Sequence, residues 1–494
     1  MTLTILLFAP LAIGLVCLAA PARAAGRIAV AGTLAVAAYT VALLVEFDAS
    51  SGSLQFLVDE TWIGELGISY KLALDGLNLI LVLLTALLWL ACTLWASMRS
   101  YDKPQLLFFH MLLAETAVLG ALLAQDLALF VVFFDLMLVP FFFLTGIWGG
   151  ARRVQATMKL VIYTLVGSLL MLTAAIATGV LSARGAPGLS FAFSDLAQRE
   201  LSTSSQYWIF LFFAAAFLVK MPAFPLHGWM PDAYRTMPLP VLAVFSGVLS
   251  KVAAYGFLRI CLPLFPDATT HFQTLILLVA LASILYGSAM AFTTTEARLI
   301  LGYSSVAQLG FITLGIFALN AEGAQGAILQ SFNHGLVVAP AFFIVALLAE
   351  RAGGSQDIRD MGGVALRAPA LATLFLIVAF ATLAMPGSAN FAGEFLILLG
   401  VFETKMAIAI AASTGVVLAS FYALRLFIGA MHNRTGPRVD SRELTPRDAL
   451  VLVPLVLAII AISLYPQFAL QRSEPTIAGE RAPAVLAAEP GSGP

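Results

Sequence analysis

Four ionisable residues lie within long apolar stretches of this sequence: Asp135, Lys220, Lys251 and Glu394. A charge at the centre of a membrane helix costs at least ~2.5–3.5 kcal/mol on insertion scales, so such residues usually serve a function. Burial weakens the proton affinity of a lysine, and a nearby carboxylate strengthens it. The residues therefore predict reversible protonation inside a membrane. Buried ion pairs that lock helices together are the alternative.

Other charged or titratable residues in apolar stretches have two interpretations each. Glu115 would link this chain to a neighbouring subunit or make a satisfied helix contact. His227, which follows a proline-rich interruption, would admit protons or cap polar backbone. Arg259 and Arg425 lie near the ends of apolar stretches, where long basic side chains can reach the membrane surface.

The composition excludes several protein classes. Of 494 residues, 61% are hydrophobic and 11% charged, whereas soluble domains carry about 25% charged residues. This excludes a soluble enzyme, a disordered scaffold and a nucleic-acid binder. Cys17, Cys92 and Cys261 lie far apart and form no CxxC pair, so no metal, iron–sulfur cluster or other cofactor is expected in this chain.

The expected fold is an all-α polytopic membrane protein with about fourteen transmembrane helices, because each span needs about 20 mostly apolar residues. The apolar segments are 1–20, 28–47, 74–98, 105–123, 126–147, 157–182, 208–225, 238–262, 272–292, 299–318, 325–349, 370–402, 405–431 and 448–465. The odd-numbered connections hold sixteen Lys and Arg, against six in the even ones and the tail. The bias predicts odd connections in the cytoplasm and both termini outside.

Two spans are interrupted in the same way. The seventh reads FLVKMPAFPLHGWMPDA at 217–233, and the twelfth reads LAMPGSANFAGEFLIL at 383–398. Proline and glycine at membrane depth are tolerated only beside protein or a polar cavity. The Met-Pro pairs are 164 residues apart, and the same shift places spans four to eight on spans nine to thirteen. Because five is odd, two such units run in opposite directions, which predicts the inverted repeat of a transporter.

These observations define five expected parts. Helices 1–3 occupy 1–104, the first five-helix repeat 105–262, the second, inverted repeat 272–431, helix 14 residues 448–466, and a loosely ordered tail 467–494. Each repeat would supply one half of a path across the bilayer.

Six stretches carry a family resemblance: FFDLMLVPFFFLTGIWGG at 133–150, FLVKMPAFPLHGWMPDA at 217–233, SGVLSKVAAYGFLR at 246–259, LGYSSVAQLGFITLGIFA at 301–318, QSFNHGL at 330–336 and MPGSANFAGEFLIL at 385–398. With them the chain resembles the antiporter-like membrane subunits of respiratory complex I, the proton-pumping NADH:quinone oxidoreductase. Among these it is most similar to the M (subunit 4) type.

The resemblance implies roles for particular residues. Asp135 would partner Lys220, Lys251 would pass protons toward the centre, and His334 would lie on the central stretch. Glu394 would close the path to the outside or to the next subunit.

Three positions depart from the family pattern, one of them Ala297, where the family often has a basic residue just before the position of Arg298. The fifth-span acid is usually Glu, so the carboxylate of Asp135 loses roughly 1–1.5 Å of reach, about one carbon–carbon bond. Gln308 stands where the family often has a histidine; it can orient water but cannot take up a proton near neutral pH. His334 would then be the only titratable imidazole on the central path.

The resemblance further implies a non-redox subunit that translocates protons, driven by quinone reduction elsewhere in the complex. NADH, FMN, iron–sulfur clusters and quinone would bind partner subunits. The partners would be other membrane-arm subunits, including neighbouring antiporter-like chains, in a bacterial inner membrane. A related multi-subunit cation/proton antiporter or membrane-bound hydrogenase complex is the main alternative. A purely structural subunit and a stand-alone solute transporter are further alternatives.

Overall fold

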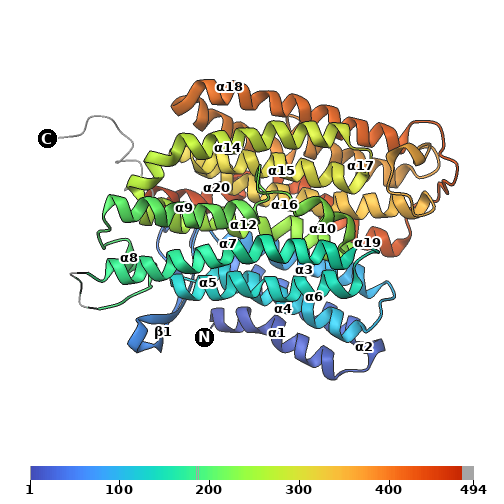
Figure 1. Cartoon of the computed structure of the whole chain (residues 1–494). Coiled ribbons are helices and arrows are strands. Elements are labelled where there is room, and N and C mark those ends of the chain that lie inside the picture. The colour runs from blue at the N-terminus through green and yellow to red at the C-terminus, as the bar shows by residue number, and fades with distance from the viewer. Residues whose placement is uncertain (1, 185, 187, 481–494) are drawn as a thin grey trace.

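The computed structural model describes residues 2–184, 186 and 188–480, and its long helices run side by side in one bundle (Figure 1). Twelve of the described helices are long and apolar enough to cross a membrane by length and composition. This confirms the predicted all-α polytopic class.

The first third of the chain contains α1 (Thr2–Ala19), α2 (Ala22–Glu46), β1 (Gln55–Ile63), η1 (Gly64–Leu66), β2 (Ile68–Leu74), α3 (Leu79–Ser97), α4 (Pro104–Leu123), α5 (Leu127–Leu136) and α6 (Leu138–Trp148). The middle contains α7 (Arg153–Ser182), α8 (Phe193–Leu196), α9 (Thr203–Lys220), α10 (Met230–Thr236), α11 (Leu239–Val244), η2 (Phe245–Leu249), α12 (Ser250–Gly256), η3 (Phe257–Cys261) and α13 (Leu262–Leu264). The last third contains α14 (Pro266–Thr293), α15 (Ala297–Ile316), α16 (Ala321–Arg351), η4 (Ile358–Asp360), α17 (Pro369–Thr382), α18 (Ala389–Met431), α19 (Pro446–Leu464) and α20 (Gln467–Glu480).

Both predicted interruptions are present. Helix α9 ends at Lys220, and α10 begins only at Met230. Helix α17 ends at Thr382, and α18 begins at Ala389 after Ala384 and Gly387, which adopt positive φ angles of 53° and 89°. Proline cannot donate a backbone hydrogen bond, so the chain leaves the helix at these points.

The helix from Leu239 to Leu264 is irregular in a different way. It contains two π-helical turns, η2 and η3, on either side of the short α-helical segment α12. Such π-bulges shift the hydrogen-bond register and occur frequently at functional sites.

The core of the bundle lies around α12, α15 and α16, which Figure 1 shows in the middle of the molecule. The membrane-length parts of these helices are almost wholly buried inside the chain. By contrast, α2, α7 and the second half of α18 expose large apolar side chains, as membrane-facing helices do.

Two elements differ from the sequence-based expectation. An antiparallel hairpin, β1–β2, precedes α3 and was not predicted. Its turn includes Gly67 at φ 63°, where a Cβ atom would collide with the backbone of Leu189. The hairpin is tied to the bundle because Asp126 caps α5 and also accepts a hydrogen bond from the Ser69 amide at 3.1 Å.

The expectation of a loosely ordered tail from 467 is wrong for residues 467–480, which form α20. The helix buries Ala469, Ser473 and Ile477, and the Thr476 hydroxyl accepts a hydrogen bond from the Gly76 amide at 3.0 Å. Packing of one helix face outweighs the low overall hydrophobicity of the segment. Residues 481–494 lie outside the described part.

Candidate functional site

Lys220 occupies the last turn of α9, just before the interruption. The freed backbone is held by neighbours: the Phe224 amide donates to the Ser283 hydroxyl at 2.9 Å, and the Trp229 indole donates to the Val219 carbonyl at 3.0 Å. The lysine is buried, with its Nζ 4.8 Å from the centre of the Phe134 ring. The break therefore fixes a buried ammonium against an aromatic face.

Asp135 lies next to Phe134 on the last turn of α5 and is half-buried. It interacts electrostatically with Lys220, but the ion pairs formed among the described residues do not include one between them. Its Oδ1 atom is buried without a hydrogen-bond partner in the described protein. The lack of direct contact between the Asp135 carboxylate and Lys220 Nζ agrees with the shorter reach of aspartate. The two groups interact only through their charges.

Lys251 lies on α12 between the two π turns and is fully buried. Its Nζ donates a hydrogen bond of 2.6 Å to the carbonyl of Ser246, which belongs to η2. A buried lysine thus rests on a backbone dipole and not on a carboxylate.

His334 lies on α16, also buried, and interacts electrostatically with Lys251. The two helices meet at glycines: a Cβ on Gly335 would lie 2.5 Å from the carbonyl oxygen of Gly247. This close approach brings the imidazole to the lysine's helix. The Nδ1 atom of His334 has no partner among the described residues, so it is available to exchange a proton.

Glu394 lies in the second turn of α18 and is buried. Its Oε1 accepts a hydrogen bond from Gln308 Nε2 at 2.8 Å, and Gln330 Nε2 donates to Gln308 Oε1 at 2.6 Å. Gly393 permits this approach, because a Cβ there would lie 2.9 Å from Cβ of Gln330. Gln308 therefore positions the carboxylate, while Glu394 Oε2 has no partner in the described protein.

The remaining sequence-derived candidates lie apart from this row. Glu115 is fully buried on α4, and neither carboxylate oxygen has a partner among the residues that the structure describes. His227 lies in the interruption after α9; its ring centre is 5.8 Å from that of Phe224, on which it stacks, and 4.8 Å from that of Tyr286, to which it is tilted.

The ion-pair lock considered for the four central residues finds no support. The ion pairs among the described residues include neither lysine and neither acid. By contrast, the expectation that Arg259 reaches the membrane surface is wrong. Arg259 is 3% exposed and forms a buried ion pair with Asp75, a residue that the sequence reasoning overlooked. The signal available was Asp75–Gly76 at the start of an apolar segment.

Comparison with known proteins identifies related chains. The family model described as NADH:quinone oxidoreductase/Mrp antiporter, TM matches residues 124–419. NADH-quinone oxidoreductase subunit M of Rhodobacter capsulatus is 34% identical, over 96% of this chain and 95% of its own. The protein of the same name from Escherichia coli K12 is 37% identical, over 85% of this chain and 84% of its own.

Solved structures agree. A chain of respiratory complex I from Thermus thermophilus with bound NADH superimposes with a TM-score of 0.88 at 29% identity, covering 98% of this chain and 100% of that one. A chain of the Mrp complex from Dietzia sp. DQ12-45-1b matches with a TM-score of 0.83 at 22% identity, covering 98% of both chains. The second likeness concerns the fold alone.

Proposed function

The chain belongs to the family of NADH:quinone oxidoreductase and Mrp antiporter membrane subunits, and we propose that it is the M-type membrane-arm subunit of a proton-pumping NADH:quinone oxidoreductase. The observation that carries the proposal is 34% identity to a subunit M over nearly the full length of both chains. The chain is a multi-pass integral membrane protein and part of an oxidoreductase complex.

The proposed path runs along the buried row. Lys220 takes up a proton while Asp135 is near, and withdrawal of Asp135 lowers the proton affinity of Lys220. The proton then passes through Lys251 and His334 to Glu394. A membrane potential opposes this movement by about 2.3 kcal/mol per charge per 100 mV, and each tenfold change in proton affinity supplies about 1.4 kcal/mol.

The division of labour within the complex is part of the proposal. This chain contributes no redox chemistry; NADH, FMN, iron–sulfur clusters and quinone bind partner subunits, and neighbouring antiporter-like chains pack on its exposed apolar helices. Both termini face outside a bacterial inner membrane, as the distribution of Lys and Arg favours.

A tag on this chain allows the test. Gentle solubilisation and purification should yield a large assembly with flavin, iron–sulfur clusters and NADH:quinone activity. A smaller assembly of membrane subunits without redox activity would instead identify a cation/proton antiporter. In the active assembly, a Lys220→Ala variant that assembles and pumps normally would contradict the path.

A further inference from the structure

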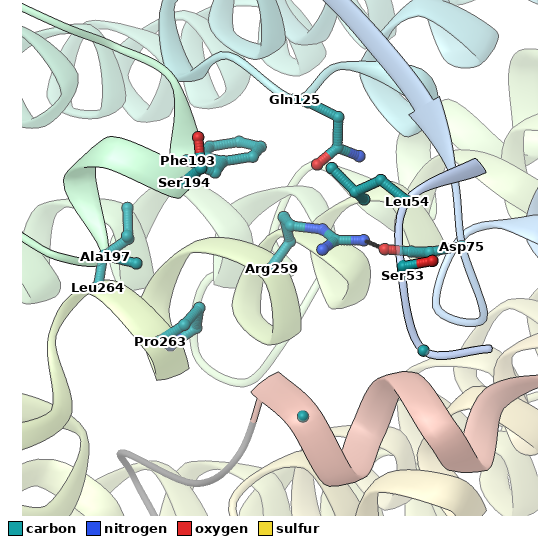
Figure 2. A pocket seen from close by; sticks show the side chains of 12 residues that line it. Ser53, Leu54, Asp75, Gln125, Phe193, Ser194, Ala197, Arg259, Pro263 and Leu264 are labelled. Atoms are coloured by element: carbon teal, nitrogen blue, oxygen red, sulfur yellow. Dashed lines mark hydrogen bonds and ion pairs between the residues drawn. The ribbon is translucent and has the colours of Figure 1, made fainter. Parts of the chain in front are cut away.

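A pocket of about 350 Å³ opens at the end of the molecule where the β1–β2 hairpin leads into α3 (Figure 2). Its rim includes Ser53, Gln125 and Ser194, and Figure 2 shows Arg259 and Asp75 facing each other within it. The loops that line it belong to the even-numbered connections and the tail, for which the charge bias predicts an outer location.

The ion pair in the pocket is held rigidly on the acid side. Asp75 Oδ1 accepts hydrogen bonds from the amides of Leu77 at 2.9 Å and Asn78 at 3.3 Å, while Oδ2 pairs with Arg259. Asp75 is fully buried in the chain. A buried ion pair pays a large desolvation penalty, and replacement by apolar residues is often neutral or stabilising, so the pair is poorly explained by stability alone.

A column of polar side chains leads from this pair into the protein. Lys251, Tyr255 and Arg259 follow one another at intervals of four on the same helix face, and Arg259 Nε donates to the Tyr255 hydroxyl at 3.0 Å. Side chains four apart on a helix have Cβ atoms about 5–6 Å apart. All three residues are at most 3% exposed. The column therefore lies between the central lysine of the proposed path and the outer pocket.

We propose that this column is an outward proton outlet that branches from Lys251 and is closed by the Asp75–Arg259 ion pair. The inference rests on the proposed function and adds a route that does not pass through Glu394. In the observed position Lys251 Nζ donates to the carbonyl of Ser246, five residues before it, whereas Tyr255 lies four residues after it. Its flexible four-carbon stem lets the ammonium swing toward Tyr255.

The proton balance is simple. The N–H bond of Lys251 breaks as the Tyr255 oxygen accepts that proton, directly or through water, and the Tyr255 O–H bond breaks as Asp75 Oδ2 accepts the next. Protonated Asp75 loses its pairing with Arg259 and releases the proton to water in the pocket. When the pair re-forms, the guanidinium charge repels protons from outside, as a fixed arginine does in selective pores.

Plugging the pocket tests the outlet without disturbing the ion pair. In Ser194→Cys, a membrane-impermeant charged thiol reagent is attached to the purified complex, which is then reconstituted in liposomes. Cys17, Cys92 and Cys261 are buried and free, so they stay unlabelled. The matched control is Ser204→Cys, exposed in the same connection at the start of α9 but outside the pocket lining.

We compare the loss of proton pumping per NADH in each variant with the loss in Lys220→Ala. Labelled Ser194→Cys should lose at least half as much as Lys220→Ala, and labelled Ser204→Cys should lose none. Asp75→Asn, which keeps an oxygen for both backbone amides, should show a similar loss at normal assembly. If labelled Ser194→Cys pumps like the unlabelled protein while Glu394→Gln and Lys220→Ala do not, the outlet is refuted and the proposed function stands. If Lys220→Ala and Glu394→Gln also pump normally, the proposed function itself fails.

Discussion

The close contact between Gly335 and Gly247 predicts that alanine substitutions at these two glycines differ in their effect on the centre of the site. An alanine Cβ at Gly335 would lie 2.5 Å from the Gly247 carbonyl oxygen, whereas ordinary contact begins at 3.4 Å. Because the obstacle is backbone, α16 and η2 must separate by almost 1 Å. Overpacking of this kind costs about 1–3 kcal/mol.

Alanine at the other glycine, Gly247, meets a side chain that can move. A Cβ at Gly247 would lie 2.6 Å from Cδ1 of Leu88, the end of a flexible side chain, and 3.5 Å from the Gly335 carbonyl. Gly247→Ala is therefore accommodated by rotation of Leu88. At Gly188, in the connection before α8, no atom lies within 4 Å of the added Cβ, so Gly188→Ala serves as the control.

Separation of the helices displaces His334 from Lys251, and a misplacement of about 1 Å can cost roughly 10²-fold in rate at a reacting centre. We expect Gly335→Ala to lower this subunit's share of pumping at least tenfold, Gly247→Ala to lower it less than threefold, and Gly188→Ala to leave it unchanged. Pumping per NADH is measured in liposomes with a pH-sensitive dye, and NADH oxidation with an artificial acceptor checks the redox partners. Equal effects of Gly335→Ala and Gly247→Ala would refute the reasoning.

Four further outcomes follow from the contacts. Asp135→Ala should abolish this subunit's pumping in the liposome assay, and Asp135→Glu, with the longer reach usual in the family, should retain it; loss in both would contradict the pairing with Lys220. Gln308→Leu removes the hydrogen bonds of Gln308 with Glu394 Oε1 and Gln330 Nε2, and these two atoms keep only their mutual contact at 3.5 Å. Each lost hydrogen bond costs about 0.5–1.5 kcal/mol, so native gels should show less intact complex, whereas Gln308→His keeps a donor and assembles. Arg235→Ala removes an exposed pair with Glu296 at 2.8 Å; such pairs contribute about 0.2–1 kcal/mol, so melting and pumping should stay near wild type. Hydrogen bonds from Arg359 lower the pKa of Asp357 from 3.8 to about 2. Above pH 3.8 the ionised carboxylate therefore stabilises the loop before α17, and this stabilisation is lost as the pH falls through about 2. Pepsin should cut the loop faster as the pH falls across that window, and Asp357→Asn should remove the pH dependence.

Much of the architecture could be predicted because a membrane span depends mainly on the composition of its own segment of sequence. Apolar length marks each helix, and Pro222 and Pro386 mark the two interruptions, since neither proline has an N–H to continue a helix. Even the boundary expected between 402 and 405 falls at Lys405, the one non-helical residue inside α18. The inverted repeat and the count of fourteen spans stay predictions.

The missing features depend on contacts between distant segments. The ion pair of Asp75 with Arg259 joins positions 184 residues apart, and no local pattern specifies it. The π turns around Lys251 have no composition of their own, and α20 forms because its small side chains pack on the bundle. The role of Gln308 illustrates the same limit: the sequence shows a lost imidazole, whereas the fold shows an amide that holds Glu394.

The three central groups rest on different partners, and this difference suggests where energy enters the path. Lys251 donates to a fixed backbone carbonyl, and Glu394 is held by the neutral amide of Gln308. Neither partner can change its charge. Lys220 alone interacts with a carboxylate that is half-buried and free of any ion pair among the described residues. A small movement of Asp135 therefore changes the proton affinity of Lys220, because the interaction energy of two charges depends on their separation. Within the proposed path, α5, which carries Asp135, is therefore the element whose movement would change the proton affinity of Lys220.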